Sequence, residues 1–296
     1  MSTPVGENRR GAVPLRGPAG EPVDFRRTLV SHGVATLAPN RIDEQAWTLE
    51  TTLPLGAVRV TEPRPGIADV EPPAAVPALR RMLNLDEDLS GFYEIAAGDP
   101  ELAWATRGAG RMLRSPSVFE DVVKTILTTN CAWSATVRMV GALVEHVGGG
   151  AFPEPEAMAA SGEDVYRDVV RAGYRGPYLR SLATSVSEGE IDLEALLDPE
   201  LPEQEVAARL LALPGVGPYA AAHAMMLVGR YSRLILDSWT RPKYARLYGR
   251  KASDRTIERR FRRYRGYAGL AFWLYLTRDW IADGEADVPW PPGAGA

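Results

Sequence analysis

The stretch LPGVGPYAAAHAMMLVGRYSRLILDSWTRP, residues 213–242, decides the fold. It sets a Gly-Val-Gly turn between two segments with helical character, 203–213 and 220–230. Gly215 and Gly217 permit the positive φ angles that a tight turn needs, and they keep side chains away from it. The second helix then starts with free N–H groups and the positive end of its dipole. The pattern predicts a phosphate-binding turn, and a plain helical hairpin with glycines at its joint is the alternative.

An isolated acid, Asp237, follows Gly215 by 22 positions and comes directly after Leu234–Leu236. One interpretation is an N-cap that accepts backbone N–H groups from Trp239 or Thr240. The other is a functional carboxylate. The two are compatible, because a capped carboxylate stays ionised and a sheltered negative charge can stabilise a developing cation.

The charge of the chain is unevenly distributed. The net charge of the 296 residues is −4, yet residues 241–265 hold eleven Lys or Arg against two acids, which gives this segment about +9. A concentrated basic segment on an acidic chain favours a nucleic-acid partner. Taken alone, the charge is explained equally well by a solvated helix face.

Several classes of protein are disfavoured by composition. The sequence has no run of about 18 apolar residues, so we expect no membrane span. Its polar start lacks the apolar stretch of a secretory signal, and we expect a cytoplasmic monomer. The single cysteine, Cys131, excludes an internal disulfide, a Cys-ligated iron–sulfur cluster and a zinc ribbon. His32, His146 and His223 are scattered, so we expect no metal and no cofactor.

The pattern of breakers predicts two folded parts, mainly α-helical and α+β overall. Residues 1–22 are expected to be a disordered tail, 23–77 a small antiparallel β-rich domain, 78–285 a helical domain, and 286–296 a flexible tail. Strands are expected over 26–33, 47–53 and 56–62, followed by a Pro-rich break at 62–77. Helices are expected over 115–130, 134–150, 203–213, 220–230 and 269–284, the first of them starting from Ser115.

Four segments in this order resemble the helix-hairpin-helix DNA glycosylases. LPGVGPYAA followed by LILDSWT is similar to the hairpin and catalytic aspartate of that family, and the aspartate falls on Asp237. The others are MLNLDEDLSGFYE (82–94), SPSVFEDVVKTILTTNCAWSATVRMVGAL (115–143) and RAGYRGPYLRSLA (171–183). The resemblance covers roughly residues 25–285. It is closest to the 3-methyladenine glycosylase II and 8-oxoguanine branches, which also carry a small N-terminal β domain.

The resemblance implies an enzyme that acts on double-stranded DNA containing a damaged base. Such an enzyme flips the nucleotide out of the duplex, and Asp237 would stabilise the cationic sugar and orient or deprotonate water. Tyr219 stands where bifunctional members place a Schiff-base lysine, so hydrolysis without AP-lyase activity is implied. An alkylated purine is the expected substrate. The alternatives are excision of an oxidised or deaminated base, and a non-catalytic lesion-binding protein on the same scaffold.

The resemblance also implies two sets of contact residues. An aromatic pocket suits a cationic base, and a residue near 130–133 would fill the hole left in the base stack. The expected base pocket consists of Tyr219, Trp133, Trp239, Asn130 and Phe92. The expected DNA contacts are Leu213, Gly215, Val216, Gly217, Thr240, Arg241, Lys243 and Arg175.

Overall fold

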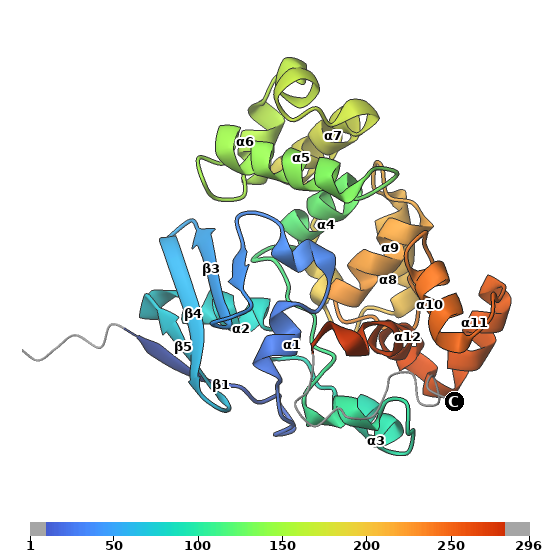
Figure 1. Ribbon diagram of the computed structural model, residues 1–296. Coiled ribbons are helices and arrows are strands. Elements are labelled where there is room, and N and C mark those ends of the chain that lie inside the picture. The colour runs from blue at the N-terminus through green and yellow to red at the C-terminus, as the bar shows by residue number, and fades with distance from the viewer. Residues whose placement is uncertain (1–9, 282–296) are drawn as a thin grey trace, which may run out of the picture.

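The computed structural model describes residues 10–281, and its N-terminal part is built on one antiparallel sheet (Figure 1). The strand order is β1-β5-β4-β3-β2, and every neighbouring pair is antiparallel. The strands are β1 (Gly11–Pro14), β2 (Arg41–Asp43), β3 (Thr48–Leu53), β4 (Gly56–Arg64) and β5 (Ile67–Glu71). β3 and β4 pair along the whole of β3, and their inward residues Leu49, Val58 and Val60 are buried. This alternation is typical of a sheet with one covered face.

Helices make up most of the remainder. The α-helices are α1 (Phe25–Leu29), α2 (Val76–Met82), α3 (Ser90–Ala97), α4 (Val118–Leu127), α5 (Trp133–His146), α6 (Pro155–Ala160), α7 (Gly176–Ser187), α8 (Glu203–Ala212), α9 (Pro218–Leu227), α10 (Thr240–Tyr248), α11 (Asp254–Phe261) and α12 (Ala268–Thr277). Shorter turns include η1 (Gly33–Thr36), η3 (Ala103–Arg107), η7 (Arg262–Tyr267) and η8 (Arg278–Trp280). None of the helices within residues 10–281 is long and apolar enough to cross a membrane.

Helix α9 is the centre of the helical part. Its residues Ala221, Ala224 and Met225 belong to a hydrophobic cluster shared with α4, α5, α7 and α8. Its residues Ala222 and Met226 belong to a second cluster shared with α3, α10, α11 and α12. A helix that is apolar on all sides must be buried on all sides. The turn that precedes α9 is therefore held in a fixed place.

The N-terminal and helical parts share contacts rather than meeting at a clean boundary. Val34 and Leu37, in and after η1, are buried within the cluster around α4 and α5. The indole Nε1 of Trp273 in α12 donates to the Ser31 carbonyl at 2.7 Å. The segment after α1 thus braces α4 and α12 against the sheet (Figure 1).

Three expectations for the N-terminal part are wrong. β1 begins at Gly11 and pairs with β5, so the expected tail over 1–22 is ordered from residue 10 onward. β5 lies inside the stretch expected as a Pro-rich break, because its short apolar run is flanked by prolines. Residues 26–33 form most of α1 and the start of η1 rather than a strand, since Asp24 caps α1 by accepting from the Arg27 amide.

The expectations for the helical part agree better with the structure. The expected helices coincide with α4, α5, α8, α9 and α12, and strands 47–53 and 56–62 with β3 and β4. The start of α4 differs, because Ser117 rather than Ser115 caps it through the Glu120 amide. The expected tail at 286–296 lies outside the described residues.

Candidate active site

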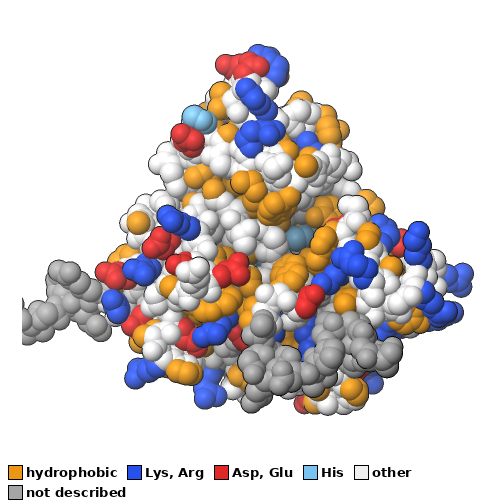
Figure 2. All heavy atoms as spheres, viewed as in Figure 1, with side chains coloured by type: hydrophobic (Ala, Val, Ile, Leu, Met, Phe, Trp, Pro, Cys, Tyr) orange, Lys and Arg blue, Asp and Glu red, His pale blue; other side chains and the backbone are white. Residues whose placement is uncertain are grey.

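A cavity of about 860 Å³ lies where the turn before α9 meets the loop after α4. Its walls come from four places in the sequence: 128–131, Tyr174, 215–220 and 236–238. The structure brings together Asn130, Gly215, Gly217, Tyr219 and Asp237 from the sets expected from sequence. Figure 2 shows this side of the molecule hollowed at its centre, with hydrophobic side chains around the hollow and Lys and Arg gathered over α10 and α11.

Asp237 is half-buried at the edge of this cavity, in the turn that leads into α10. Its Oδ1 accepts hydrogen bonds from the backbone N–H groups of Trp239 at 2.8 Å and Thr240 at 2.6 Å. Its own N–H donates to Oγ1 of Thr240 at 2.8 Å. The N-cap interpretation of Asp237 is confirmed. Both donors bind Oδ1, and within residues 10–281 no hydrogen-bond partner occupies Oδ2.

Tyr219 is in the first turn of α9, and it lines the same cavity as Asp237. Its hydroxyl is 3.3 Å from Oγ1 of Thr128 across the cavity. Burial raises the pKa of the Tyr219 hydroxyl, and the Asp237 carboxylate adds to that increase. The group is therefore a neutral hydrogen-bonding phenol at neutral pH, and it supplies no amine to the cavity.

The turn before α9 presents backbone N–H groups to the outside. Val216 donates to the Leu213 carbonyl at 3.2 Å and Ala221 to the Gly217 carbonyl at 2.9 Å, which closes the turn. The start of α9 has no side-chain cap, and Pro218 carries no N–H. Among residues 10–281, the amides of Gly217 and Tyr219 have no hydrogen-bond acceptor. An uncapped helix start of this kind is a ready site for a phosphate.

Proteins similar to this chain include DNA glycosylases. No protein-family model matches the chain. A DNA-3-methyladenine glycosylase from Bacillus subtilis is 24% identical over 164 residues, covering 52% of this chain and 54% of the relative. The chain thus spans about half the length of the curated relatives it matches.

Solved structures match over nearly the whole chain. The 3-methyladenine DNA glycosylase of Archaeoglobus fulgidus superposes with a TM-score of 0.68 at 21% identity, covering 92% of this chain and all of that one. The 8-oxoguanine glycosylase/lyase of Clostridium acetobutylicum gives a TM-score of 0.70 at 19% identity, covering 91% and 95%. This chain has the helix-hairpin-helix DNA glycosylase fold. This fold confirms the resemblance to the helix-hairpin-helix DNA glycosylases that the sequence shows.

The two glycines of the hairpin have different roles in this glycosylase fold. Gly215 has φ +78, and a Cβ there would lie 2.9 Å from Cδ2 of Tyr178. Gly217 has φ −98, which any residue can adopt, and a Cβ there would meet nothing within 4 Å. The expectation of a positive φ is thus correct for Gly215 and wrong for Gly217. Gly217 instead keeps the surface of the turn clear.

We expect Gly215→Ala to lower the free energy of unfolding by about 1–2 kcal/mol, because an L-residue at this φ is strained. Gly217→Ala should leave it within about 0.5 kcal/mol of the original protein. Urea unfolding followed by circular dichroism measures both. Equal stability losses at the two positions would contradict this division of roles.

Gly217→Ala should nevertheless raise the Kd for duplex DNA, because its methyl group lies where a phosphate approaches the amides. Anisotropy with a labelled duplex measures this effect, and an unchanged Kd would contradict the assignment of the turn to the DNA backbone.

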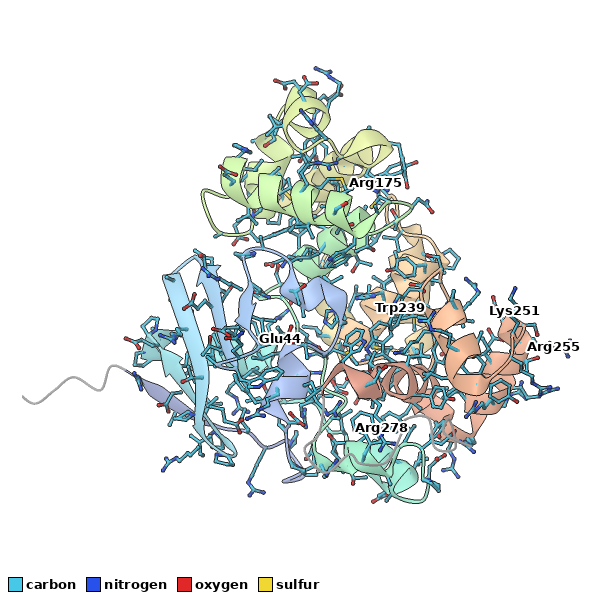
Figure 3. The ribbon with its side chains drawn as sticks, in the orientation of Figure 1. Glu44, Arg175, Trp239, Lys251, Arg255 and Arg278 are labelled. Atoms are coloured by element: carbon cyan, nitrogen blue, oxygen red, sulfur yellow. The ribbon has the colours of Figure 1, made fainter. Side chains whose placement is uncertain are left out.

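Three of the aromatic residues expected in the base pocket lie elsewhere in the glycosylase fold. Phe92 is fully buried in the cluster around α12, so its place in the pocket is wrong. Trp133 is 46% exposed, and its ring packs over Gly33 of η1. Trp239 is 39% exposed and packs on Trp273 and Trp280, with centroids 5.7 and 5.8 Å apart (Figure 3). Neither tryptophan lines the Asp237 cavity.

Arg175, expected to contact DNA, is instead a buried structural residue. Its guanidinium donates to the Thr129 carbonyl, to Oγ1 of Thr129 and to the Ala172 carbonyl, the last two at 3.3 Å. It lies next to the start of α7, in the part of the molecule at the top of Figure 3. Arg175 therefore fixes the loop that carries Asn130, and its contact with DNA is a wrong prediction. Asn130 itself is exposed, has φ +48 and donates to the Tyr174 hydroxyl at 3.2 Å.

Other residues expected to contact DNA also make their contacts within the protein instead. The Thr240 side chain is fully buried and serves the Asp237 turn. Lys243 is ion-paired with Asp279, and its side chain is only 13% exposed. Leu213 and Val216 are buried in the first hydrophobic cluster, so only their backbone remains near the surface.

The basic segment is partly neutralised by ion pairs. Within residues 10–281, four of its eleven cations pair with carboxylates: Arg241 with Asp254, Lys243 with Asp279, Arg260 with Glu101, and Arg263 with Asp99. Arg241 is exposed, and it does not line the Asp237 cavity. The other three pairs join α10 to η8, and join α11 and η7 to the loop 98–102 between α3 and η3.

Two buried histidines pack together near Tyr219. His223 lies one helical turn beyond Tyr219 in α9, and His32 lies just before η1. The rings of His32 and His223 are 5.3 Å apart and edge to face, and the Tyr219 ring is 6.3 Å from His223. Nε2 of His32 donates to the Leu113 carbonyl at 2.8 Å. Burial, with a further contribution from His223, lowers the pKa of His32 to about 3, and burial lowers that of His223 to about 4. Both rings are neutral at physiological pH.

The two buried histidines predict that the free energy of unfolding falls at acidic pH. Because both folded pKa values lie below the ordinary 6.5, the unfolded chain binds more protons between about pH 6.5 and 4, and stability falls as the pH falls through that window. The loss is roughly 2 kcal/mol per histidine at pH 5. Burial raises the pKa of Asp121 to about 6, which opposes part of this loss. Urea titrations from pH 7 to 5 measure it.

His223→Gln should remove roughly 2 kcal/mol of that loss at pH 5, since one of the two histidine titrations is removed. His146→Gln is the matched control, because His146 is exposed and should leave the curve unchanged. A curve that is equally steep with and without His223 would contradict the assignment.

Sequence reasoning missed several residues that line the cavity. Thr128, Tyr174 and Ser238 lie on its wall. Tyr174 could have been predicted, because it belongs to the segment 171–183 that carries the family resemblance. Thr128 and Ser238 have no distinguishing pattern in the sequence. Among residues 10–281, no three His, Cys, Asp or Glu side chains are grouped so as to hold a metal ion.

Proposed function

We propose that this chain is a monofunctional DNA glycosylase that hydrolyses the N-glycosidic bond of a damaged base, with alkylated purines as its preferred substrates. One observation carries the proposal. The Asp237 carboxylate is held by two backbone amides at the edge of a cavity whose neighbouring wall is Tyr219. The cavity thus offers a carboxylate held by two backbone donors and, among its lining residues, no lysine.

The proposed reaction uses each of these features. As the glycosidic bond breaks, its electron pair leaves with the base and positive charge develops on the sugar. The Asp237 carboxylate stabilises that charge, and water adds to the sugar carbon and loses a proton. A cationic alkylated base leaves as a neutral molecule, so it needs no acid to protonate it. Without an amine at position 219, no Schiff base forms and the strand stays intact.

The hairpin supports duplex DNA as the partner. The free amides of Gly217 and Tyr219 donate to a backbone phosphate without reading sequence. The neighbouring Clostridium enzyme has been solved with double-stranded DNA containing cytosine opposite 8-oxoguanine. A base inside a duplex is out of reach of Asp237, so the target nucleotide must be flipped.

Alkylated purines are favoured by the name of the Bacillus subtilis relative and by the two tyrosine rings, Tyr219 and Tyr174, on the cavity wall. Oxidised bases are the second candidate. They are favoured by the fold match to an 8-oxoguanine enzyme and by the polar groups of Thr128, Asn130 and Ser238 on the same wall.

A panel of duplexes separates the two substrate classes. Each duplex carries one lesion: 7-methylguanine, 3-methyladenine, hypoxanthine or 8-oxoguanine. We expect the methylated purines to be released fastest under single-turnover conditions. Release of 8-oxoguanine or hypoxanthine alone would overturn the alkylated-base assignment and retain the glycosylase one. Tight binding without release of any base would support a lesion-binding protein instead.

A further inference from the structure

A second cavity, of about 620 Å³, adjoins the cavity that holds Asp237. The two share Pro218, Tyr219 and Leu236 as a common wall. The remaining walls of the second cavity come from the segment after α9, from α10 and α11, and from η7 and the start of α12. It lies on the side of the molecule where basic side chains gather (Figure 2).

Four arginines line this cavity: Arg233, Arg241, Arg262 and Arg265. Arg241 is held by Asp254 through two hydrogen bonds of 2.8 and 2.9 Å. The other three are exposed, and within residues 10–281 no carboxylate lies within 4.0 Å of them. One further acid, Glu258, lines the cavity, so its charge is positive.

Arg265 is held in a strained backbone conformation. Its φ is 53° and its ψ is −126°, at the kink between α11 and α12. A residue with a Cβ in such a region costs about 1–3 kcal/mol, a cost that glycine avoids. The arginine side chain lines the cavity. A strained arginine at this place indicates that its side chain is needed there.

The backbone fixes these arginines relative to one another. The Gly269 amide donates to the Tyr231 carbonyl at 2.7 Å. A Cβ on Gly269 would lie 2.1 Å from the Arg233 carbonyl oxygen, so the first turn of α12 packs directly on the backbone that carries Arg233. The backbone that carries Arg233 is thus held against the start of α12, three residues after Arg265.

We infer that this arginine cavity binds phosphate groups of the damaged strand next to the flipped nucleotide. The inference rests on the proposed function. Guanidinium groups match phosphate oxygens in a bidentate manner and keep their charge at all relevant pH values. A strand whose sugar lies at Asp237 has its neighbouring phosphates at the wall that the two cavities share. The cavity therefore sets the position of that strand.

The test uses equilibrium binding to a labelled duplex with a tetrahydrofuran abasic analogue, which requires no base release. We expect the triple variant Arg233→Gln, Arg262→Gln, Arg265→Gln to raise the Kd roughly 100-fold at low salt. The slope of log Kd against log salt should fall by about 0.9 for each phosphate that the variant no longer binds.

The matched control carries the same charge change outside the cavity: Arg246→Gln, Arg255→Gln, Arg259→Gln. These arginines lie on α10 and α11, two of the helices that border the cavity, and Arg255 is at the outer edge of the molecule (Figure 3). We expect a much smaller rise in Kd. An equal effect of both triples would overturn the inference in favour of diffuse attraction.

Neutral methylphosphonates next to the analogue provide a second readout. They should weaken binding of the original protein and have little further effect on the cavity triple. Equal sensitivity of both proteins to the methylphosphonates would overturn the inference.

Arg265→Gly separates binding from folding. Relief of backbone strain should raise the Tm by about 2–4 °C, while the Kd for the same duplex rises. An unchanged Kd would overturn the role of Arg265. Failure of the original protein to release any base would overturn the proposed function instead, and it would leave these binding results standing.

Discussion

Asp237→Asn is expected to slow base release from a methylated duplex by about 10²–10³-fold, the range seen when one electrostatic contact to a transition state is removed. The amide keeps an oxygen that can accept from the Trp239 and Thr240 N–H groups, so the turn into α10 is retained. Only the negative charge is lost. Single-turnover kinetics with excess enzyme measure the chemical step.

Asp43→Asn is the matched control. Oδ1 of Asp43 accepts from the Gln45 and Ala46 amides at 2.8 and 3.0 Å, which is the same local geometry as at Asp237. It lies at the end of β2, far along the sequence from the cavity, and should release base at the original rate. A full rate for Asp237→Asn would remove Asp237 from the mechanism. An equal loss for both variants would point to a general effect of the substitution.

The second large expected effect is the gain of a new activity, cleavage of the DNA strand. Tyr219→Lys places an amine beside Asp237, and we expect it to form a Schiff base with an abasic sugar and to cut the strand by β-elimination. A pre-formed abasic duplex is the substrate, so no base release is required. Borohydride should trap a covalent complex with Tyr219→Lys and none with the original protein.

Tyr219→Phe controls for loss of the phenol without adding an amine, and it should show neither cleavage nor trapping. Trapping of the original protein would contradict the assignment of hydrolysis, because it would reveal another amine acting on the sugar. Absence of trapping with Tyr219→Lys would show that position 219 does not reach the sugar.

The sequence was most informative where local pattern and packing agree. The helices α4, α5, α8, α9 and α12 were expected because their apolar residues recur at helical spacing or run without interruption. Gly215 and Asp237 stood out because each is conspicuous in its local context. Of the five strands in the N-terminal sheet, only β3 and β4 were predicted. β1, β2 and β5 are short, and they are ordered by pairing in the sheet: β1 with β5, β2 with β3, and β5 also with β4.

Side-chain partners were the main source of error in the site. Arg175 and Lys243 were expected at DNA because they are cationic, yet their partners, the Thr129 carbonyl and Asp279, are 46 and 36 positions away along the chain. Phe92 was expected in the pocket because it is aromatic, and it packs on Tyr267 with centroids 5.7 Å apart. Such contacts depend on tertiary structure and leave no local signal.

The same limit hid the arginine cavity. Arg233 and Arg265 are 32 positions apart, and the close packing of Gly269 on the Arg233 backbone brings them to one wall. The basic segment was visible in the sequence as a total charge. Within residues 10–281, four of its cations are paired with acids from the loop 98–102 between α3 and η3, from α11 and from η8, and that pairing depends on the tertiary structure.

The most direct test of the central claim is product analysis with the original protein. A duplex treated with a methylating agent is incubated with the protein, free bases are separated by chromatography, and the strands are run on a denaturing gel before alkali. We expect released 3-methyladenine or 7-methylguanine together with uncut strands. Recovery of no free base, or strands already cut before alkali, would contradict it.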